Sequence, residues 1–335
     1  MKRYCSILLL FLLPSCIFAQ IETIYQNSIN SNILQLSHPK NIPTYKIPYF
    51  DYQKDSKRSS NNPNIFAKGS DVSLSLEKGM WTNTNGGRIW SMAVQTSDSY
   101  SLTFSFDEIH LPGNGYMYIT NEDETIIYGP ITSKNLPQTD FFLSDVIVGN
   151  KAIITLFEPT DKTGESILEI SKVYCGFKDF STINNKQSKS IRGCDNEIAC
   201  DSNFDIESHG IAYIVYPWNG NLARSTGFLI ATTDLSFKPY LQTAFHTIDI
   251  DGDNNLSNEE RAAIQNGTFK FDYKYSSCEG NDYSKSYTYN GALIRSYYSV
   301  TDFALLELSE AVQKWRAHPE RHRWYLHRQP QRVGC

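Results

Sequence analysis

The stretch "YSLTFSFDEIHLPGNGYMYIT", residues 100–120, carries the pattern that decides the fold class. Two runs rich in β-branched and aromatic residues flank "LPGNG", which is made of turn-forming residues. Such runs, separated by turns, are typical of antiparallel strands. They recur between about residues 70 and 175, at "DVSLSLE", "TIIYG", "AIITLFE" and "ILEISKVY". Because no helical periodicity of useful length appears there, this region is predicted to be a β-sandwich.

A second set of strand patterns follows residue 193, at "GIAYIVYP", "TGFLIAT", "PYLQTA", "FKFDYKY" and "FALLEL". The one convincing helix is "SNEERAAIQNG", which ends at Gly267. Between the two sets lies "FSTINNKQSKSIRG", residues 180–193, which is polar and has almost no apolar residues. A segment of this composition cannot bury itself and is predicted to be a linker. The chain is therefore expected to be all-β, with two domains.

The N-terminal segment, residues 1–19, has two basic residues, a short apolar run and a small residue at Ala19, as in a secretory signal peptide. A single-pass anchor is the alternative, but the run is shorter than the roughly 20 residues that a span needs. We therefore expect export to a secreted or periplasmic location and no membrane span. Residues 20–70 are rich in Asn, Ser and Pro and are expected to form an extended leader before a sandwich over 71–179.

Charge and cysteine content narrow the classes of function. The chain of 335 residues has a net charge of −5, and its basic residues are interspersed with acids until the last 25, so no nucleic-acid partner is predicted. In an exported protein the cysteines at 175, 194, 200, 278 and 335 are expected to form disulfides. Their spacing lacks the paired pattern of a zinc site.

The order of motifs in the second domain carries a family resemblance. "STGFLI" (225–230) is followed by "TAFH" (243–246) and then by "TDFALLEL" (301–308). This order resembles that of trypsin-like serine peptidases, specifically the secreted bacterial lysyl-endopeptidase-like group. The resemblance implies a partial trypsin-like peptidase domain over 194–310, equivalent to the first barrel of a double β-barrel, behind a leader domain.

The resemblance implies that His246 is the general base and that Asp302 orients it. A carboxylate on the second ring nitrogen fixes the tautomer and stabilises the imidazolium that forms during acyl transfer. Because Asp302 precedes the apolar run "FALLEL", its carboxylate is expected to enter a largely buried setting. The resemblance also implies a disulfide between Cys200 and Cys278.

Two departures from the family pattern stand out. The positions that the family commonly joins by a disulfide beside the active site are Ser225 and Thr247 here. In addition, the catalytic serine follows the aspartate in this family, whereas this chain has no serine after Ser309. The tail, 311–335, changes abruptly to Arg, His, Pro and Gln, so we expect it to be out of frame; a basic binding tail is the alternative.

The sequence thus predicts a secreted serine endopeptidase precursor that is truncated before its nucleophile and inactive as given. Its substrate would be a protein or peptide if a second barrel completed it. The basic residues Lys186, Lys189 and Arg192 of the linker are expected processing sites. A non-catalytic pseudoprotease and a calcium-dependent binding protein are the rival hypotheses.

The segment "DIDGDNNLSNEE", residues 249–260, fits a twelve-residue calcium loop followed by a helix. Oxygen ligands at this spacing suit a hard cation such as structural Ca²⁺. Asn254 stands where Gly normally takes the sharp turn, and Asn tolerates left-handed backbone better than other residues. A solvated acidic loop is the alternative. The expected ligands are Asp249, Asp251, Asp253, the Asn255 carbonyl, Ser257 and a bidentate Glu260.

Overall fold

The structure is a computed structural model that describes residues 20–26, 41–48, 64–178, 198–233, 236, 238–278, 285–310 and 312. The predicted signal peptide, the linker with its processing sites, and the tail apart from Val312 lie outside these residues. Cys194 and Cys335 lie outside them as well. Within the described residues the fold is mostly strand with a few short helices, which confirms the predicted all-β class.

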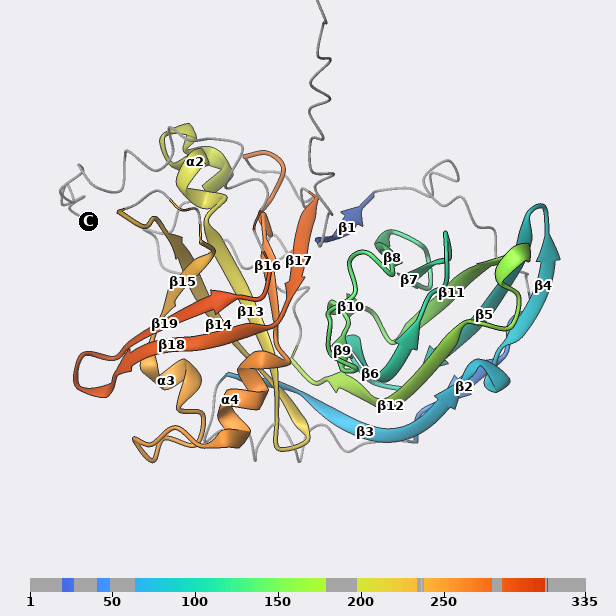
Figure 1. The fold of residues 1–335 in the computed structure, drawn as a ribbon, viewed down its shortest axis with the longest axis horizontal. Helices are drawn as coiled ribbons and strands as arrows, with labels where there is room; N and C mark the ends of the chain where they lie inside the picture. Colours follow the sequence, from blue (N-terminus) through green and yellow to red (C-terminus); the bar gives the residue numbers. More distant parts are fainter. Residues whose placement is uncertain are drawn as a thin grey trace, which may run out of the picture.

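The described chain forms two lobes, seen side by side in Figure 1. The first, called the sandwich lobe, comprises residues 64–178. One of its sheets contains β3 (Ile65–Ser75), β12 (Ile167–Gly176), β6 (Ser101–His110), β9 (Phe142–Leu143) and β10 (Ile147–Val148). The other contains β4 (Met80–Thr84), β5 (Gly87–Gln95), β11 (Lys151–Pro159), β7 (Tyr116–Asn121) and β8 (Ile126–Thr132).

The decisive stretch at 100–120 forms β6, the turn and β7. Leu102, Phe104 and Phe106 of β6 are fully buried in the core between the two sheets, and Met117 and Ile119 of β7 join them. Two short 3-10 turns, η2 (Leu76–Lys78) and η3 (Thr160–Lys162), complete this lobe. The core forms because inward-facing residues of both sheets interdigitate.

The second lobe, called the barrel lobe, comprises the described residues of 198–310. Its antiparallel strands run in the spatial order β17 (Ser286–Asn290), β16 (Thr268–Phe271), β13 (Ile211–Trp218), β14 (Asn221–Ile230), β15 (Tyr240–Thr243), β19 (Phe303–Leu308) and β18 (Ala292–Tyr298). The first and last of these are joined along the chain by Gly291 alone, so the sheet curls around one core. Asn219 and Gly220 form a two-residue hairpin between β13 and β14; both have positive φ, the backbone of a type I′ turn.

Helices are few and short. The barrel lobe contains α2 (Asp205–Ser208), α3 (Phe245–Ile248) and α4 (Asn258–Gln265), with 3-10 turns η6 (Ile198–Cys200), η7 (Ser202–Phe204) and η8 (Ser299–Thr301). The predicted helix after the acidic segment is α4. It ends at the C-cap Asn266, immediately before the predicted Gly267.

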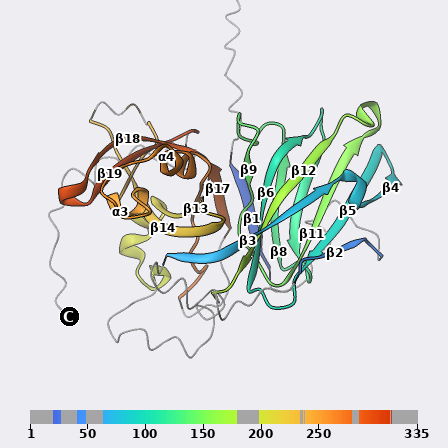
Figure 2. The same cartoon turned by 90° about the horizontal axis from the view of Figure 1, so that it is seen from below.

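The segment expected to be an extended leader contributes strands to both lobes. β1 (Ile21–Tyr25) pairs with β8 of the sandwich lobe and with β17 of the barrel lobe. β2 (Thr44–Lys46) pairs in parallel with β5. β3 crosses the boundary expected at residue 71; residues between Ile65 and Lys68 pair with β14, and residues from Ala67 to Ser75 pair with β12. Figure 2 shows β3 passing from one lobe to the other.

The lobes also meet through a buried apolar cluster and an ion pair. Phe66 and Tyr174 of the sandwich lobe pack with Val215 and Leu222 of the barrel lobe. Lys270 Nζ of β16 lies 2.6 Å from Asp145 Oδ1, and these side chains are only 5% and 3% exposed. Burial disfavours the charged lysine and is the largest single effect, but the Asp145 carboxylate and Tyr25 together outweigh it and raise the pKa of Lys270. The two lobes are therefore joined both by strand pairing and by a buried ion pair.

No helix in the described part of the chain has the length and apolar character needed to cross a membrane.

Candidate active site

His246 and Asp302 lie at adjoining strand ends of the barrel lobe. His246 belongs to α3, which follows β15, and Asp302 immediately precedes β19. β15 and β19 are antiparallel neighbours, with Thr243 paired to Ala304. Because the end of one strand lies beside the start of the other, the residues just beyond this pair meet.

Asp302 contacts both the ring and the backbone of the histidine turn. His246 Nδ1 lies 2.7 Å from Asp302 Oδ2, and the His246 backbone N–H donates to Asp302 Oδ1 at 2.9 Å. The Phe245 N–H donates to the Asp302 carbonyl at 3.0 Å. These contacts fix the imidazole plane and direct Nε2 away from the carboxylate. No serine among the described residues hydrogen-bonds to the His246 ring.

The Asp302 carboxylate is held in its charged form by hydrogen bonds. The N–H of His246 contributes most and its ring contributes further, so the pKa of Asp302 is lowered despite partial desolvation. The expectation of a largely buried Asp302 is wrong, because its side chain is 52% exposed and that of His246 is 65% exposed. Asp302 lies in the turn after η8, with a left-handed φ of 53°, and not within the buried strand.

Ser225 and Thr247, the two positions that depart from the family's disulfide, are neighbours in space. Their hydroxyl oxygens are 2.7 Å apart. Thr243 Oγ1 lies 3.2 Å from Thr247 Oγ1 and 2.8 Å from the Thr226 carbonyl. A chain of hydroxyl groups thus joins β14 to α3. It holds the turn that carries His246 where a covalent bond is lacking.

Three of the expected metal ligands converge directly after α3. One carboxylate oxygen each from Asp249, Asp251 and Asp253 lies within 4.8 Å of the other two. Asn254 has a φ of 66°, the left-handed conformation anticipated for the position that Gly usually takes, and its N–H donates to Asp249 Oδ2 at 3.1 Å. The Asn255 N–H donates to Asp253 Oδ1 at 2.7 Å.

Glu260 and Ser257, two of the expected ligands, hydrogen-bond to backbone groups and to each other. Glu260 is fully buried, and its Oε1 accepts from the N–H of Ile250 at 2.6 Å while its Oε2 accepts from the N–H of Ser257 at 2.8 Å. Ser257 Oγ accepts from the Glu260 N–H, so the pair forms a capping box at the start of α4. Backbone donors near the helix start therefore compete with any ion for these side chains, and their role as metal ligands stays a prediction. The sequence pattern Ser-x-x-Glu before a helix, here Ser257 to Glu260, indicates such a capping box.

A second histidine–carboxylate pair was not foreseen. His209 Nδ1 hydrogen-bonds to Asp272, whose side chain is buried. The other ring nitrogen, Nε2, lies 3.9 Å from Oδ2 of Asp205, four residues earlier in the chain. His209 has acidic groups on both sides and a side chain that is 19% exposed, against 65% for His246. The predicted Cys200–Cys278 disulfide is present and ties η6 to the segment after β16, near this pair.

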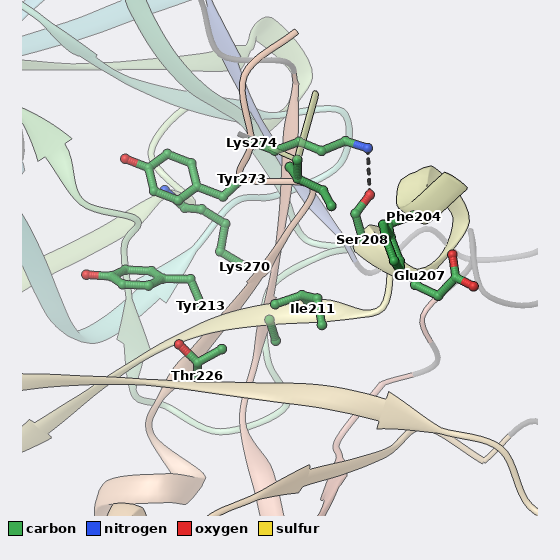
Figure 3. A pocket seen from close by; sticks show the side chains of 11 residues that line it. Phe204, Glu207, Ser208, Ile211, Tyr213, Thr226, Lys270, Tyr273 and Lys274 are labelled. Carbon is green, nitrogen blue, oxygen red and sulfur yellow. Dashed lines mark hydrogen bonds between the residues drawn. The ribbon is translucent and has the colours of Figure 1, made fainter. Parts of the chain in front are cut away.

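A cavity of about 500 Å³ opens on the barrel lobe away from the His246 pair, and neither His246 nor Asp302 lines it. In Figure 3 the side chains of Tyr213, Tyr273 and Lys270 lie at one end, and Phe204 and Ser208 of the η7–α2 region lie at the other. Lys274 Nζ donates to Ser208 Oγ at 2.7 Å. Because Lys270 belongs to the ion pair with Asp145, this cavity adjoins the junction between the lobes.

A comparison with known protein families finds a similarity in the part of the chain that contains the barrel lobe. Residues 188–326 match the family model described as lysyl endopeptidase, C-terminal domain. The matched range includes α3, the acidic segment after it and β19. The match supports a lysyl-endopeptidase-like protein and a peptidase-related, hydrolytic function, in a family that is typically extracellular.

Proposed function

We propose that the barrel lobe carries the base and the orienting carboxylate of a secreted, trypsin-like serine endopeptidase. The observation that carries this proposal is the contact of 2.7 Å between His246 Nδ1 and Asp302 Oδ2, on a ring whose other nitrogen faces away from the carboxylate. The match of residues 188–326 to the lysyl endopeptidase domain supports the same reaction class. A protein or peptide is the proposed substrate.

In the proposed reaction His246 acts through Nε2. A serine hydroxyl attacks the scissile carbonyl carbon and gives its proton to Nε2, and the resulting imidazolium returns that proton to the leaving amine. Asp302 remains ionised, holds the proton on Nδ1 and stabilises the imidazolium. Its lowered pKa supports this role, since the carboxylate must keep its charge throughout the cycle.

The nucleophile is proposed to come from a second barrel that packs beside η8. The β18–η8 segment points away from the sandwich lobe in Figure 1 and exposes large apolar side chains between the start of β18 and the residues just before Asp302. These are Leu293, Tyr297, Tyr298 and Val300, of which Val300 is 79% exposed. An apolar group of this kind is typical of a surface that another domain covers.

The sandwich lobe is proposed to be the leader of a precursor. It contributes strand pairs and a buried ion pair to the barrel lobe, so it supports that lobe's fold directly. Lys186, Lys189 and Arg192 remain the proposed processing positions. A cut there would leave β1 and β3 in place between the lobes.

The gene sequence beyond the codon for Asp302, translated in all three frames, is the first test. A frame that continues from about residue 310 into a second barrel with a "GDSG"-like turn would support the peptidase. If every frame closes, the proposal of catalysis by this polypeptide is wrong, and the pseudoprotease or calcium-dependent binding hypothesis replaces it.

Labelling with a fluorophosphonate tests the chemistry. The 335-residue chain alone should not react, because it offers no serine to His246 among the described residues. The polypeptide from a continuing frame should react and hydrolyse peptides. The variant His246→Ala should be labelled at least a hundredfold more slowly. The control variant His110→Ala, at an exposed position of β6, should be labelled at the wild-type rate. Equal labelling of both variants would contradict the role of His246.

A further inference from the structure

The acidic segment after α3 can bring three carboxylates to one ion. The closest oxygen atoms of Asp249, Asp251 and Asp253 all lie within 4.8 Å of one another. Calcium binds oxygen at about 2.4 Å, so two oxygens bound to the same ion are at most about 4.8 Å apart. The three side chains are therefore close enough together to be ligands of a single calcium ion.

An independent observation comes from the buried oxygen of Asp249. This side chain is only 6% exposed. Its Oδ2 accepts from the Asn254 N–H, but its Oδ1 is buried and has no hydrogen-bond partner. A buried, unpartnered carboxylate oxygen is costly, and native structures usually provide a donor or an ion for it. A cation between the three aspartates would supply this missing partner.

The local charge also favours a cation. Five carboxylates, those of the three aspartates, Glu259 and Glu260, lie within residues 249–260. Among the residues that the structure describes, none of the five forms an ion pair with a lysine, arginine or histidine. Glu260 is occupied by backbone N–H groups, which leaves the aspartates as ligands. Carboxylate oxygens suit a hard divalent ion, with water and carbonyl oxygens in the remaining positions.

The same segment holds the turn that carries His246. Asp249 is the C-cap of α3, and its N–H donates to the Phe245 carbonyl at 2.9 Å. Glu260 of α4 accepts from the Ile250 N–H, so the next residue is fixed as well. An ion bound at Asp249 would restrain the C-terminal end of α3, while Asp302 restrains its N-terminal end.

We propose that Asp249, Asp251 and Asp253 bind one calcium ion and that this ion positions the His246 turn. The positioning role rests on the proposed function, whereas the binding site stands by itself. The bound ion would help to restrain the His246 turn, as a disulfide between positions 225 and 247 would do if these residues were not Ser225 and Thr247.

The experiment uses the full chain and needs no enzymatic activity. Isothermal titration with CaCl₂ should show one equivalent bound. The midpoint of thermal unfolding should be several degrees higher in CaCl₂ at a hundred times Kd than in EDTA, because the ion binds the folded state alone. Hydrogen exchange of peptides covering 243–250 should slow in CaCl₂. MgCl₂ at the same concentration should have a smaller effect, because Mg²⁺ demands a tighter octahedral site.

Matched variants separate the site from general charge effects. Asp249→Asn and Asp251→Asn should each abolish the rise in midpoint and the slowed exchange. Asp249→Asn should also unfold at an equal or higher temperature than the wild type in EDTA, since it removes a buried charge. Asp123→Asn, an exposed turn aspartate of the sandwich lobe, should leave the calcium response unchanged.

Three results would overturn the proposal. The first is the absence of any calcium response at millimolar concentrations, and the second is a response that both site variants retain. The third, binding without slowed exchange over 243–250, would refute the positioning role. None of these measurements involves hydrolysis. A chain that binds calcium in this way but never reacts with a fluorophosphonate would refute only the proposed catalysis, so the two failures are distinguishable.

Discussion

Asp302 makes three hydrogen bonds to the turn that carries His246, and its own backbone conformation is unusual. Its φ of 53° lies in the left-handed region, which Asp and Asn tolerate better than most residues. In that conformation the carboxylate can accept from both the backbone and the ring of His246, while its own carbonyl accepts from Phe245. A short polar side chain is therefore needed here for local geometry as well as for chemistry.

Replacing Asp302 by Asn should reduce stability in a pH-dependent way. Since the folded-state pKa of Asp302 is lowered, its carboxylate stabilises the fold above the unfolded value of about 3.9, and this contribution is lost as the pH falls through the folded pKa. Asp302→Asn suits the left-handed backbone, removes the charge and replaces one of the two acceptor oxygens by an NH₂ group. Its side chain is largely exposed, so the loss at pH 6 should be below about 1 kcal/mol.

Urea unfolding of both proteins from pH 2 to pH 7 measures this difference. The gap in unfolding free energy should be largest at pH 6 and should shrink as the pH falls below about 4. Asp123→Asn, in an exposed turn, controls for the loss of one negative charge. A gap that stays constant over the whole range would show that Asp302 contributes only through its shape.

At the scale of elements, α3 shows how a turn of four residues can be held by its neighbours. It is too short to be stable alone. Asp302 fixes its start, the Ser225–Thr247 hydroxyl contact fixes its middle, and the acidic segment follows its end. Each contact comes from a different part of the chain. The position of His246 therefore depends on three elements at once.

The double variant Ser225→Cys/Thr247→Cys should form a disulfide. The two hydroxyl oxygens are already 2.7 Å apart, so their β-carbons point toward one another as a disulfide requires. Closing a loop of 22 residues should stabilise the fold by about 3 kcal/mol in the chain-entropy account. Thiol titration of the unfolded, unreduced protein should find no more free thiols than in the wild type. Each single variant should add one thiol, and two extra thiols in the double variant would contradict the expected geometry.

The strands were predictable where the sequence itself contains alternating apolar and polar residues bounded by turn-forming residues. "YSLTFSF" and "GYMYIT" became β6 and β7, and "FALLEL" became β19. β1 and β2 were not predictable in this way, because they are short and pair with strands distant in sequence. The nearness of His246 to Asp302 followed from motif order. The exposure of Asp302 and the use of Glu260 as a helix cap did not, since both depend on local backbone geometry.

At the scale of the whole molecule, the two lobes form one cooperative unit in our interpretation. β1 is hydrogen-bonded on one side to β8 and on the other to β17, and β3 joins β12 to β14. Asp145 links three segments, because it accepts from Thr23 Oγ1 at 2.6 Å as well as pairing with Lys270. None of these contacts could be predicted from the sequence, since each joins residues more than 90 positions apart.

Replacing Lys270 by Met tests this unity. The change leaves the Asp145 carboxylate buried without its cation, which should cost about 3–5 kcal/mol of unfolding free energy. Lys285→Met is the matched control, because Lys285 Nζ also forms an ion pair, with Glu22 of β1, but its side chain is 54% exposed. Its cost should stay below about 1 kcal/mol.

Adding Asp145→Asn to Lys270→Met should recover part of the lost unfolding free energy, since no buried charge then remains. Urea unfolding followed by tryptophan fluorescence and circular dichroism should give coincident transitions for the wild type. If Lys270→Met and Lys285→Met have equal effects, the buried ion pair does not hold the lobes together, and the shared strands alone must do so.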